Sequence, residues 1–306
     1  MPDTIEATLM RAGTSRGLYL LSADLPSDQA ARDRILVALM GSARAHQVDG
    51  VGGTVSVTNK IAMVSRSSGD KADIDYLFAQ VDPTAGTVDY GPTCGNLLTG
   101  IAPFAIERGL VEAGSQHTRV RIHLVNTGSF VEATVQTPDG DVRYEGDTVI
   151  DGIDGGAAPV TLAFLDCVGS KTGALLPTGK PCEVIDGVEV TLVDAAMPMM
   201  LVKAVDVGRS GDESVAALRA DKELMARLEP MRLEAGRRMG LGDVTGKVIP
   251  KIGMLAPPRK GGALLSRYFT PDTPHPSHAV TGGVAVAVAS RVPGTVASTK
   301  LPVLTR

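Results

Sequence analysis

The sequence predicts an α+β protein made of two similar halves. Three observations carry this prediction: both halves contain many short strand-like segments, each contains one strongly apolar helix, and a glycine-containing turn stands where each of these helices begins. The two turns are Cys94-Gly95-Asn96 and Thr281-Gly282-Gly283. Because the second half repeats the layout of the first, we expect two pseudo-symmetric units, residues 1–157 and 158–306.

In the first half, a strand hairpin with a turn at residues 11–16 is expected to open the chain. Pro26-Ser27-Asp28, followed by apolar residues at helical spacing, predicts a helix that ends near Gly41. The apolar run 97–110 predicts a single buried helix with Cys94 at its entrance. Alternating segments bounded by turn residues predict strands at residues 4–9, 17–21, 60–64, 72–81, 119–125, 130–136 and 142–144.

In the second half, the most helical stretch covers residues 214–239, and Pro230 is expected to divide it. A small apolar helix is expected at residues 284–289, opened by the turn at Thr281. Strands are expected at residues 160–165, 188–193, 199–205 and 263–269.

Composition excludes several classes of function. The net charge of -4 is spread without basic or acidic blocks, which disfavours nucleic acid and anionic membranes as partners. No apolar stretch is long enough to span a bilayer, and no secretion signal begins the chain. Three cysteines without a CxxC pair indicate neither a disulfide framework nor a zinc site, so a cytoplasmic location is expected. Aromatic residues make up only 3% and no nucleotide-binding loop is present, which disfavours a nucleotide cofactor.

Two features of the sequence bear on ligands. Exposed N–H groups and the helix dipole make a helix N-terminus suited to a carboxylate, so two such ends facing one cleft would suit a substrate with two or more carboxylates. His275 and His278 do not indicate a metal site, because Pro276 opposes a helical pair and no third ligand is evident. For these histidines we favour hydrogen bonds to substrate or loop.

Seven motifs, in one order along nearly the whole chain, resemble the PrpF family of the diaminopimelate-epimerase-like fold. They are Met10-Arg11-Ala12-Gly13-Thr14-Ser15-Arg16-Gly17, Asp49-Gly50-Val51-Gly52-Gly53-Thr54, Asn59-Lys60-Ile61-Ala62, Asp89-Tyr90-Gly91-Pro92-Thr93-Cys94-Gly95-Asn96, Gly169-Ser170-Lys171-Thr172-Gly173, Ala196-Met197-Pro198 and His275-Pro276-Ser277-His278-Ala279-Val280-Thr281-Gly282.

The resemblance implies two units, each a β-barrel-like sheet around a central helix, with no metal or organic cofactor. It also implies a small di- or tricarboxylate substrate, and a homodimer is the expected assembly. Because relatives usually continue past the position of Arg306, the second unit is expected to lack its last elements.

The resemblance further implies that Lys60 and Cys94 transfer protons. The second helix entrance has no cysteine, which disfavours inversion of a chiral centre by two thiols. An amine and a thiol suit removal of a proton at one carbon and its return at another, provided that Lys60 is neutral when it acts as base. Substrate contacts are expected from Arg11, Thr14, Ser15, Arg16, Gly52, Gly53, Gly95, Asn96, Ser170, Lys171, Thr172, Met197, His275, Ser277, Thr281, Gly282 and Gly283.

Three functional hypotheses are compatible with the sequence. The leading one is an isomerase or tautomerase that shifts a proton along an unsaturated polycarboxylate, with 4-oxalomesaconate from aromatic-acid breakdown as the expected substrate. The second is an isomerase of aconitate or 2-methylaconitate, which lack the keto group. The third, a non-catalytic carboxylate-binding protein, is disfavoured because both Lys60 and Cys94 are retained.

Overall fold

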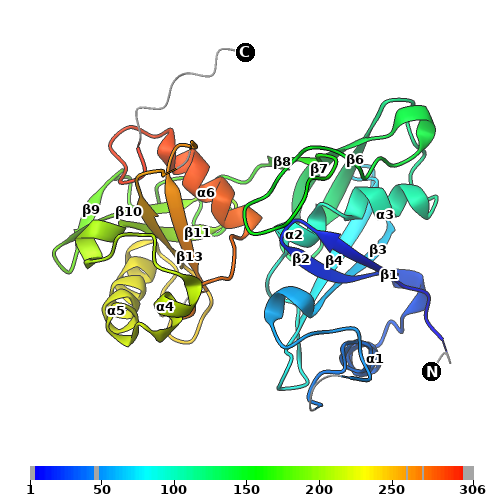
Figure 1. Ribbon diagram of the computed structural model, residues 1–306, viewed down its shortest axis with the longest axis horizontal. Helices are drawn as coiled ribbons and strands as arrows, with labels where there is room; N and C mark the ends of the chain where they lie inside the picture. The colour runs from blue at the N-terminus through cyan, green and yellow to red at the C-terminus, as the bar shows by residue number, and fades with distance from the viewer. Residues whose placement is uncertain (1–3, 45–47, 260, 271, 299–306) are drawn as a thin grey trace. The chain divides into compact units, whose positions relative to one another are not determined.

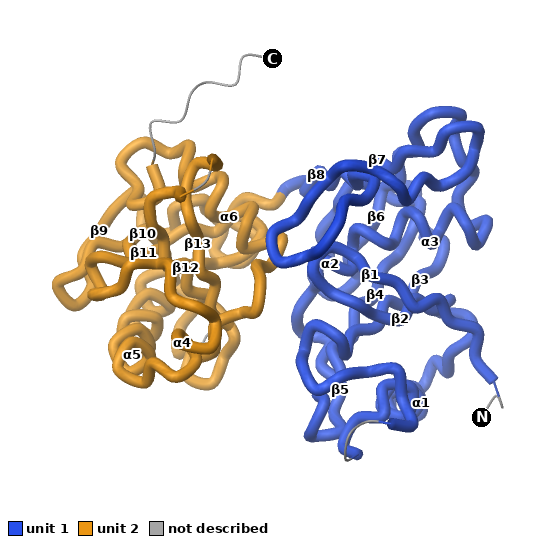
Figure 2. The backbone as a smooth tube through the Cα atoms, viewed as in Figure 1, with its two compact units in different colours: residues 1–166 blue, residues 167–306 orange. Residues whose placement is uncertain are grey.

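The computed structural model describes residues 4–44, 48–259, 261–270 and 272–298, and the chain divides into two compact units, residues 1–166 and 167–306 (Figure 2). The division falls later than the boundary we expected at residues 157 and 158. The reason is β8 (Thr161–Leu165), which we had assigned to the second half but which pairs antiparallel with β7 (Ser129–Gln136) and extends the first unit's sheet.

Unit 1 is built on a mixed sheet, to which the described residues contribute eight strands (Figure 1). Their order is β1-β2-β3-β4-β6-β7-β8, and β5 pairs with β4. The pairs β2/β3 and β4/β6 are parallel, whereas the other neighbours are antiparallel. The strands not yet located are β1 (Thr8–Ala12), β2 (Ser15–Leu21), β3 (Lys60–Arg66), β4 (Ile74–Val81), β5 (Val88–Asp89) and β6 (His117–Leu124).

Helices cover both faces of this sheet. On one face α1 (Gln29–Met40) packs with Ile61 and Met63 of β3, and on the other α2 (Gly95–Leu98) and α3 (Ile101–Glu107) pack with Ala62 and Val64. Every strand from β1 to β8 except β5 contributes to the cluster around α2 and α3, so the sheet curls around these helices. Since successive side chains of a strand leave on opposite faces, this pattern places Lys60 on the α2/α3 face.

Three expectations for unit 1 need correction. The single helix expected over residues 97–110 is two helices, broken at Gly100, where a Cβ would lie 2.3 Å from the Tyr19 hydroxyl. Pro103 stands in the first turn of α3, where its missing N–H is tolerated. The first hairpin turns at residues 13–14 rather than 11–16, and residues 142–144 form no strand.

Unit 2 is a smaller version of this arrangement. Its described residues form a five-stranded sheet of order β13-β12-β11-β10-β9, with α6 (Val280–Ser290) on one face and α4 (Val215–Ala220) and α5 (Lys222–Arg238) on the other (Figure 1). The strands are β9 (Glu183–Ile185), β10 (Val188–Asp194), β11 (Pro198–Lys203), β12 (Lys251–Ala256) and β13 (Leu265–Phe269).

Unit 2 also departs from the sequence-based expectations. β12 was not predicted, although it is an interior strand of the sheet, between β11 and β13. The break in the long helical stretch falls at Asp221, and Pro230 lies inside α5. α6 begins at Val280, four residues earlier than expected, so Thr281, Gly282 and Gly283 belong to its first turn.

The two units share one topology, and this confirms the expected pseudo-symmetric α+β fold. In each unit an antiparallel hairpin comes first, β1–β2 in unit 1 and β10–β11 in unit 2, and a helical segment follows it. The next strand, β3 or β12, pairs parallel with the second strand of the hairpin. An antiparallel strand, β4 or β13, and then a buried helix complete the unit. Lys60 begins β3 and Lys251 begins β12, and each is 9% exposed. No helix of the described residues is long and apolar enough to cross a membrane.

Candidate active site

Lys60 lies in a row of residues that crosses three strands of unit 1. It pairs with Gly17 of β2 on one side and with Gln80 of β4 on the other. Gly17 carries no side chain here because a Cβ would lie 2.5 Å from the Lys60 carbonyl oxygen and 2.9 Å from Leu97 Cδ2. The first turn of α2 therefore sits directly on this row, and the buried Lys60 side chain leaves the sheet toward it.

The Lys60 amine has two close neighbours from β4. Its Nζ donates to Oε1 of Gln80 at 3.0 Å and lies 5.2 Å from the centre of the Phe78 ring. Both neighbours are uncharged. The site thus holds an amine that is nearly removed from solvent and is contacted by an amide oxygen and an aromatic face.

Cys94 is the residue at which α2 begins. Its Sγ accepts a hydrogen bond from the Leu97 N–H at 3.4 Å, and its side chain belongs to the core cluster on the same sheet face as Lys60. Burial raises the pKa of both Tyr19 and Tyr76, and the charge of a Cys94 thiolate raises the two pKa values further. Both phenols therefore stay protonated and donate, Tyr19 to the Leu97 carbonyl at 2.7 Å and Tyr76 to the Cys94 carbonyl at 3.4 Å.

Three hydroxyls of unit 1 are buried without a hydrogen-bond partner in the described part of the chain, those of Ser15, Thr93 and Thr127. Ser15 is 4% exposed, and Thr93 directly precedes Cys94. Ser15 lies on the same face of β2 as Gly17 and Tyr19. A buried hydroxyl without a partner loses hydrogen-bonding free energy, so ligand oxygens would satisfy these groups.

The glycine motifs shape the backbone around the site. Gly13 (φ 54°) turns the first hairpin against Asn96, whose Oδ1 accepts from the Thr14 N–H at 3.2 Å. Gly52 and Gly53 pack closely on Asn59 and Thr58, because a Cβ on either would approach their side-chain oxygens to 2.3 and 2.4 Å. The predicted Thr14 thus lies in the β1–β2 turn, Gly95 and Asn96 lie in the first turn of α2, and Gly52 and Gly53 lie in the loop that leads toward β3.

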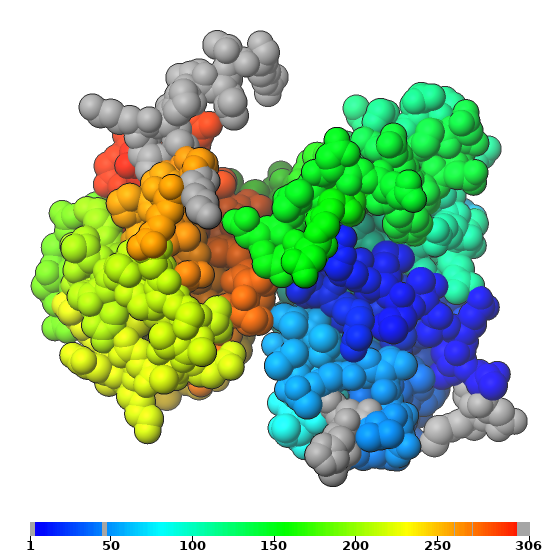
Figure 3. Space-filling model, in the orientation of Figure 1, coloured from blue at the N-terminus to red at the C-terminus, as the bar shows by residue number. Residues whose placement is uncertain are grey.

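Arg11 and Arg16 are not brought together with Lys60. They face each other across the β1–β2 ladder at positions whose side chains leave on the opposite face of the sheet. Arg11 donates to the Gly13 carbonyl at 2.9 Å, and Arg16 to the Val51 carbonyl at 3.2 Å. Arg11 instead lines a hollow of about 180 Å³ between the first hairpin and residues 143–160, which lie side by side in dark blue and green in Figure 3.

The predicted residues of the second half lie in unit 2, where Ser170, Lys171 and Thr172 form a turn around Asp194. This fully buried carboxylate accepts from the Lys171 N–H at 2.8 Å and the Thr172 N–H at 2.9 Å. The hydroxyls of Ser170 (3.3 Å) and Thr172 (2.9 Å) also bond to it. The polar groups we had assigned to substrate are therefore used within the protein, while the Lys171 side chain is exposed.

The remaining predicted residues of unit 2 lie near Tyr268 and in the core beside α6. Gly282 packs on the Tyr268 ring, and the His275 ring meets it edge-on at 5.9 Å. Ser277 donates its N–H to His275 Nδ1 at 3.0 Å. Burial lowers the pKa of His278, which leaves its ring neutral near pH 7 and bonded to Ser266 at 3.0 Å. Met197 packs against the apolar cluster, Thr281 is buried, and Gly283 follows on α6.

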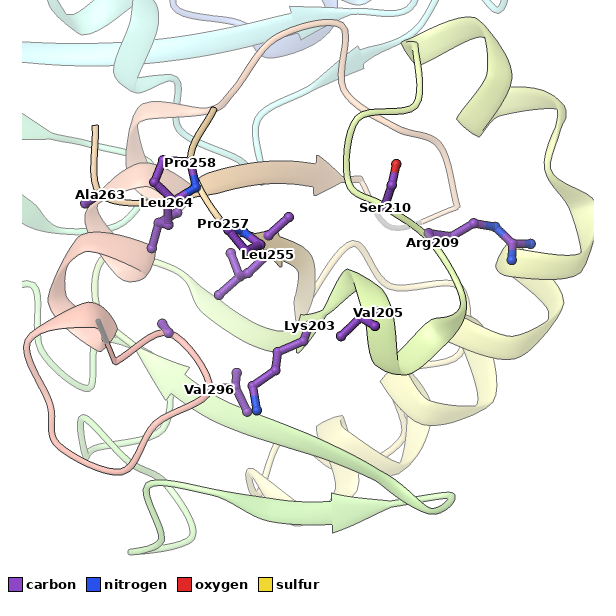
Figure 4. Close-up of a pocket in the computed structure, with 12 residues that line it drawn as sticks. Lys203, Val205, Arg209, Ser210, Leu255, Pro257, Pro258, Ala263, Leu264 and Val296 are labelled. Atoms are coloured by element: carbon purple, nitrogen blue, oxygen red, sulfur yellow. The ribbon is translucent and has the colours of Figure 1, made fainter. Parts of the chain in front are cut away.

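An apolar cavity of unit 2 is a poorer candidate for the active site. Within residues 4–44, 48–259, 261–270 and 272–298, no three His, Cys, Asp or Glu side chains gather that could hold a metal ion. An apolar cavity of about 470 Å³ in unit 2 is lined by Leu255, Pro257 and Leu264 (Figure 4). Its two cations are neutralised, because Lys203 pairs with Glu189 at 3.1 Å and Arg209, which points away, pairs with Asp221 at 2.6 Å.

Sequence reasoning missed several residues that the structure makes prominent. Gln80 could have been noticed as a polar position on the face of β4 that otherwise carries Ile74, Tyr76 and Phe78. Thr93 stands inside a recognised motif beside Cys94. Asp194 and Lys251 gave no signal, because their importance depends on burial and on strand pairing across many residues.

Comparisons with known proteins extend over nearly the whole chain. The family model described as PrpF protein matches residues 3–304. The 4-oxalomesaconate tautomerase of Pseudomonas putida is 49% identical over 293 residues, which cover 96% of this chain and 81% of that protein. The (4E)-oxalomesaconate Delta-isomerase of Novosphingobium sp. is 48% identical over 296 residues, which cover 97% and 83%.

Solved structures show the same fold. Methylitaconate-delta-isomerase superposes with a TM-score of 0.82 at 35% identity, covering 96% of this chain and 82% of that one. A hydroxyproline epimerase from Agrobacterium vitis gives a TM-score of 0.54 at 13% identity, covering 94% and 76%, which speaks for the fold alone. The expected epimerase-like architecture is confirmed.

Proposed function

This chain belongs to the PrpF family, and on that premise we propose that it is an isomerase that shifts a proton along an unsaturated polycarboxylate, with 4-oxalomesaconate as its substrate. Relatives with 48 and 49% identity over nearly its whole length are named as oxalomesaconate isomerase and tautomerase. Relatives named for 3-methylitaconate and 2-methyl-aconitate are 35 and 32% identical. The higher sequence identity to the oxalomesaconate enzymes therefore favours 4-oxalomesaconate, which carries a keto group, as the substrate.

One observation of the site carries the mechanism that we propose. Lys60 and Cys94 lie on the same face of one sheet, and Leu97 in the first turn of α2 packs on the row that contains Lys60. An amine and a thiol in such a place can serve as proton acceptor and proton donor to one ligand.

The reaction is an isomerisation, so the substrate and the product have the same composition and the same overall oxidation state. A base removes a proton from carbon next to a carbonyl or conjugated carboxylate, the electron pair spreads over the unsaturated system, and an acid returns a proton at another carbon. The negative charge that develops on oxygen needs hydrogen-bond donors placed in advance. The unpartnered hydroxyls of Ser15 and Thr93 are donors of this kind.

We assign proton removal to the neutral form of Lys60. Its environment suits this role, since its contacts from β4 are an amide oxygen and an aromatic ring. Cys94 then donates or relays the second proton, and a thiolate formed there keeps the Leu97 N–H as a hydrogen-bond donor.

The test is proton exchange in deuterated water, followed by NMR and by the absorbance of the conjugated product. Wild-type protein with 4-oxalomesaconate should place deuterium at an allylic carbon. Lys60→Met should lower the rate about 100-fold or more, because general base catalysis is lost. Lys71→Met, at an exposed lysine of the same unit, is the matched control and should keep the wild-type rate.

Two outcomes would overturn parts of the proposal. Exchange at the wild-type rate in Lys60→Met would remove Lys60 from the mechanism. Parallel assays with cis-aconitate and 2-methylaconitate test the substrate, and a higher kcat/KM for either would replace 4-oxalomesaconate by a substrate without the keto group.

The homodimer and the cytoplasmic location that we expect from the sequence remain predictions. Light scattering coupled to size-exclusion chromatography measures the first, and fractionation of cells that express the chain measures the second.

A further inference from the structure

The Gln80 side chain is fixed by the backbone next to Lys60. Its Nε2 donates to the carbonyl oxygens of Asn59 at 2.8 Å and Ser56 at 3.1 Å. Because carbonyl oxygens only accept hydrogen bonds, these contacts settle which end of the amide is which. Oε1 must then face Lys60, whose Nζ donates to it at 3.0 Å.

The charged groups of the neighbouring strands are engaged elsewhere. On β5, Asp89 stands opposite Gln80, but its carboxylate accepts from the Gly91 N–H at 2.8 Å. On β2, Arg16 leaves the opposite face of the sheet and donates to Val51.

The other elements around Lys60 add no ion pair. On the same side of the sheet, α2 begins at Cys94, whose Sγ accepts from the Leu97 N–H, and β4 carries the Phe78 ring and, farther along the strand, the protonated phenol of Tyr76. Across the residues that the structure describes, no carboxylate forms an ion pair with Lys60.

We propose that Gln80 is a positioning residue for the reaction: its amide oxygen holds the Lys60 amine in place without pairing its charge. The inference rests on the proposed role of Lys60 as proton acceptor. An amide oxygen accepts a hydrogen bond from a neutral amine as well as from an ammonium group. A carboxylate at this place would instead attract the ammonium form and hold its proton.

The sharpest experiment replaces the amide by a carboxylate of the same shape. In Gln80→Glu, Lys60 should keep its proton to higher pH, so the acid limb of the kcat profile should move to higher pH. We expect kcat near pH 7 to fall at least tenfold and to recover at alkaline pH, with KM changed less than threefold. A merely structural role would lower activity without moving the profile.

A second readout needs no substrate. The reactivity of the Lys60 amine, measured against pH by competitive labelling with acetic anhydride and peptide mass spectrometry, should reach its midpoint at higher pH in Gln80→Glu than in wild type. An unchanged midpoint would overturn the proposal even if the substrate has been assigned wrongly. If wild type fails to isomerise 4-oxalomesaconate while the midpoint moves, the proposed function fails and the contact between Gln80 and Lys60 stands.

Two further variants keep the test decisive. Gln80→Met removes the acceptor without adding charge, so kcat should fall at least tenfold at every pH with no shift of the profile; kcat within twofold of wild type would contradict the proposal. Gln136→Glu makes the same chemical change on β7, in the same sheet but outside the site, and should leave both the profile and the labelling midpoint unchanged.

Discussion

At the scale of single residues, the site depends on a position without a side chain, Gly17, as well as on the side chains around it. Gly17 has an ordinary backbone conformation for a strand, so a left-handed φ is not the reason for glycine there. The reason is the close approach of the Lys60 carbonyl and of Leu97. This one position connects the strand that carries Lys60 with the helix that Cys94 begins.

Replacing Gly17 by alanine should therefore disturb both stability and catalysis. The added methyl group would lie 2.5 Å from a backbone oxygen, which cannot move without shifting β3. We expect unfolding in urea to show a loss of about 1–3 kcal/mol, together with a lower kcat. Gly69→Ala is the control, since no atom lies within 4 Å of the place that its added methyl group would take, and the cost should stay within about 0.5 kcal/mol.

At the scale of elements, helix ends are set by side-chain caps more than by proline. Asp221 accepts from the Leu224 N–H at 3.0 Å and begins α5, while it also binds Arg209 through both carboxylate oxygens, at 2.6 and 2.9 Å. Pro230 is accommodated inside α5. The expectation of a break at Pro230 was wrong. The helix boundary lies at Asp221 instead, because its carboxylate accepts from a free N–H group at the start of α5 and also pairs with a charged side chain.

Substitutions of Asp221 should distinguish the stability that comes from its capping hydrogen bond from the stability that comes from its charge. The hydrogen bonds from Arg209, followed by that from Leu224, lower the pKa of Asp221 from its usual 3.8. A carboxylate whose pKa is lower in the folded than in the unfolded chain stabilises the fold at pH values above its unfolded pKa. This stabilisation is lost as the pH falls through the folded pKa. Asp221→Asn keeps a capping oxygen, so its cost in urea unfolding should be present at pH 7 and shrink below about pH 4.

Two comparisons complete this test. Asp221→Ala also removes the cap and should cost about 1 kcal/mol more than Asp221→Asn. Ser214→Ala removes the uncharged cap of α4, which accepts from the Ala217 N–H at 3.1 Å, and its cost should not vary with pH. Equal costs of Asp221→Asn at pH 7 and pH 3 would contradict the role of the charge.

At the scale of the whole molecule, each unit has its own hydrophobic cores. Phe104 belongs to the cluster between α3 and the sheet of unit 1, and Phe269 to the cluster between α5 and the sheet of unit 2. The clusters of the two units share no residue. The pseudo-symmetric units thus repeat a topology without sharing a core.

Hydrogen exchange on the intact chain should reveal this division. Phe104→Ala leaves a cavity that costs about 3–5 kcal/mol, and we expect faster exchange in β2, β3 and β4 with wild-type protection in β10, β11 and β12. Phe269→Ala should give the reverse pattern. Equal acceleration in both units after either substitution would show that the chain unfolds as one cooperative body.

The sequence by itself determined the fold class, the family and the two residues proposed for proton transfer, because these depend on local periodicity and on motifs that are contiguous in the chain. Lys60 was placed at the start of a strand and Cys94 at the start of a helix, and the structure has both there.

Only the tertiary structure decided what surrounds those residues. β12 escaped prediction because its parallel partner β11 is distant in sequence and Gly253 interrupts its side-chain pattern where Leu201 needs the space. Gln80 acquires a role only when β4 pairs with β3, and Asp194 only when the turn at residues 170–172 folds onto it. Burial and pairing between distant segments create these contacts, and neither is encoded in any single stretch of the chain.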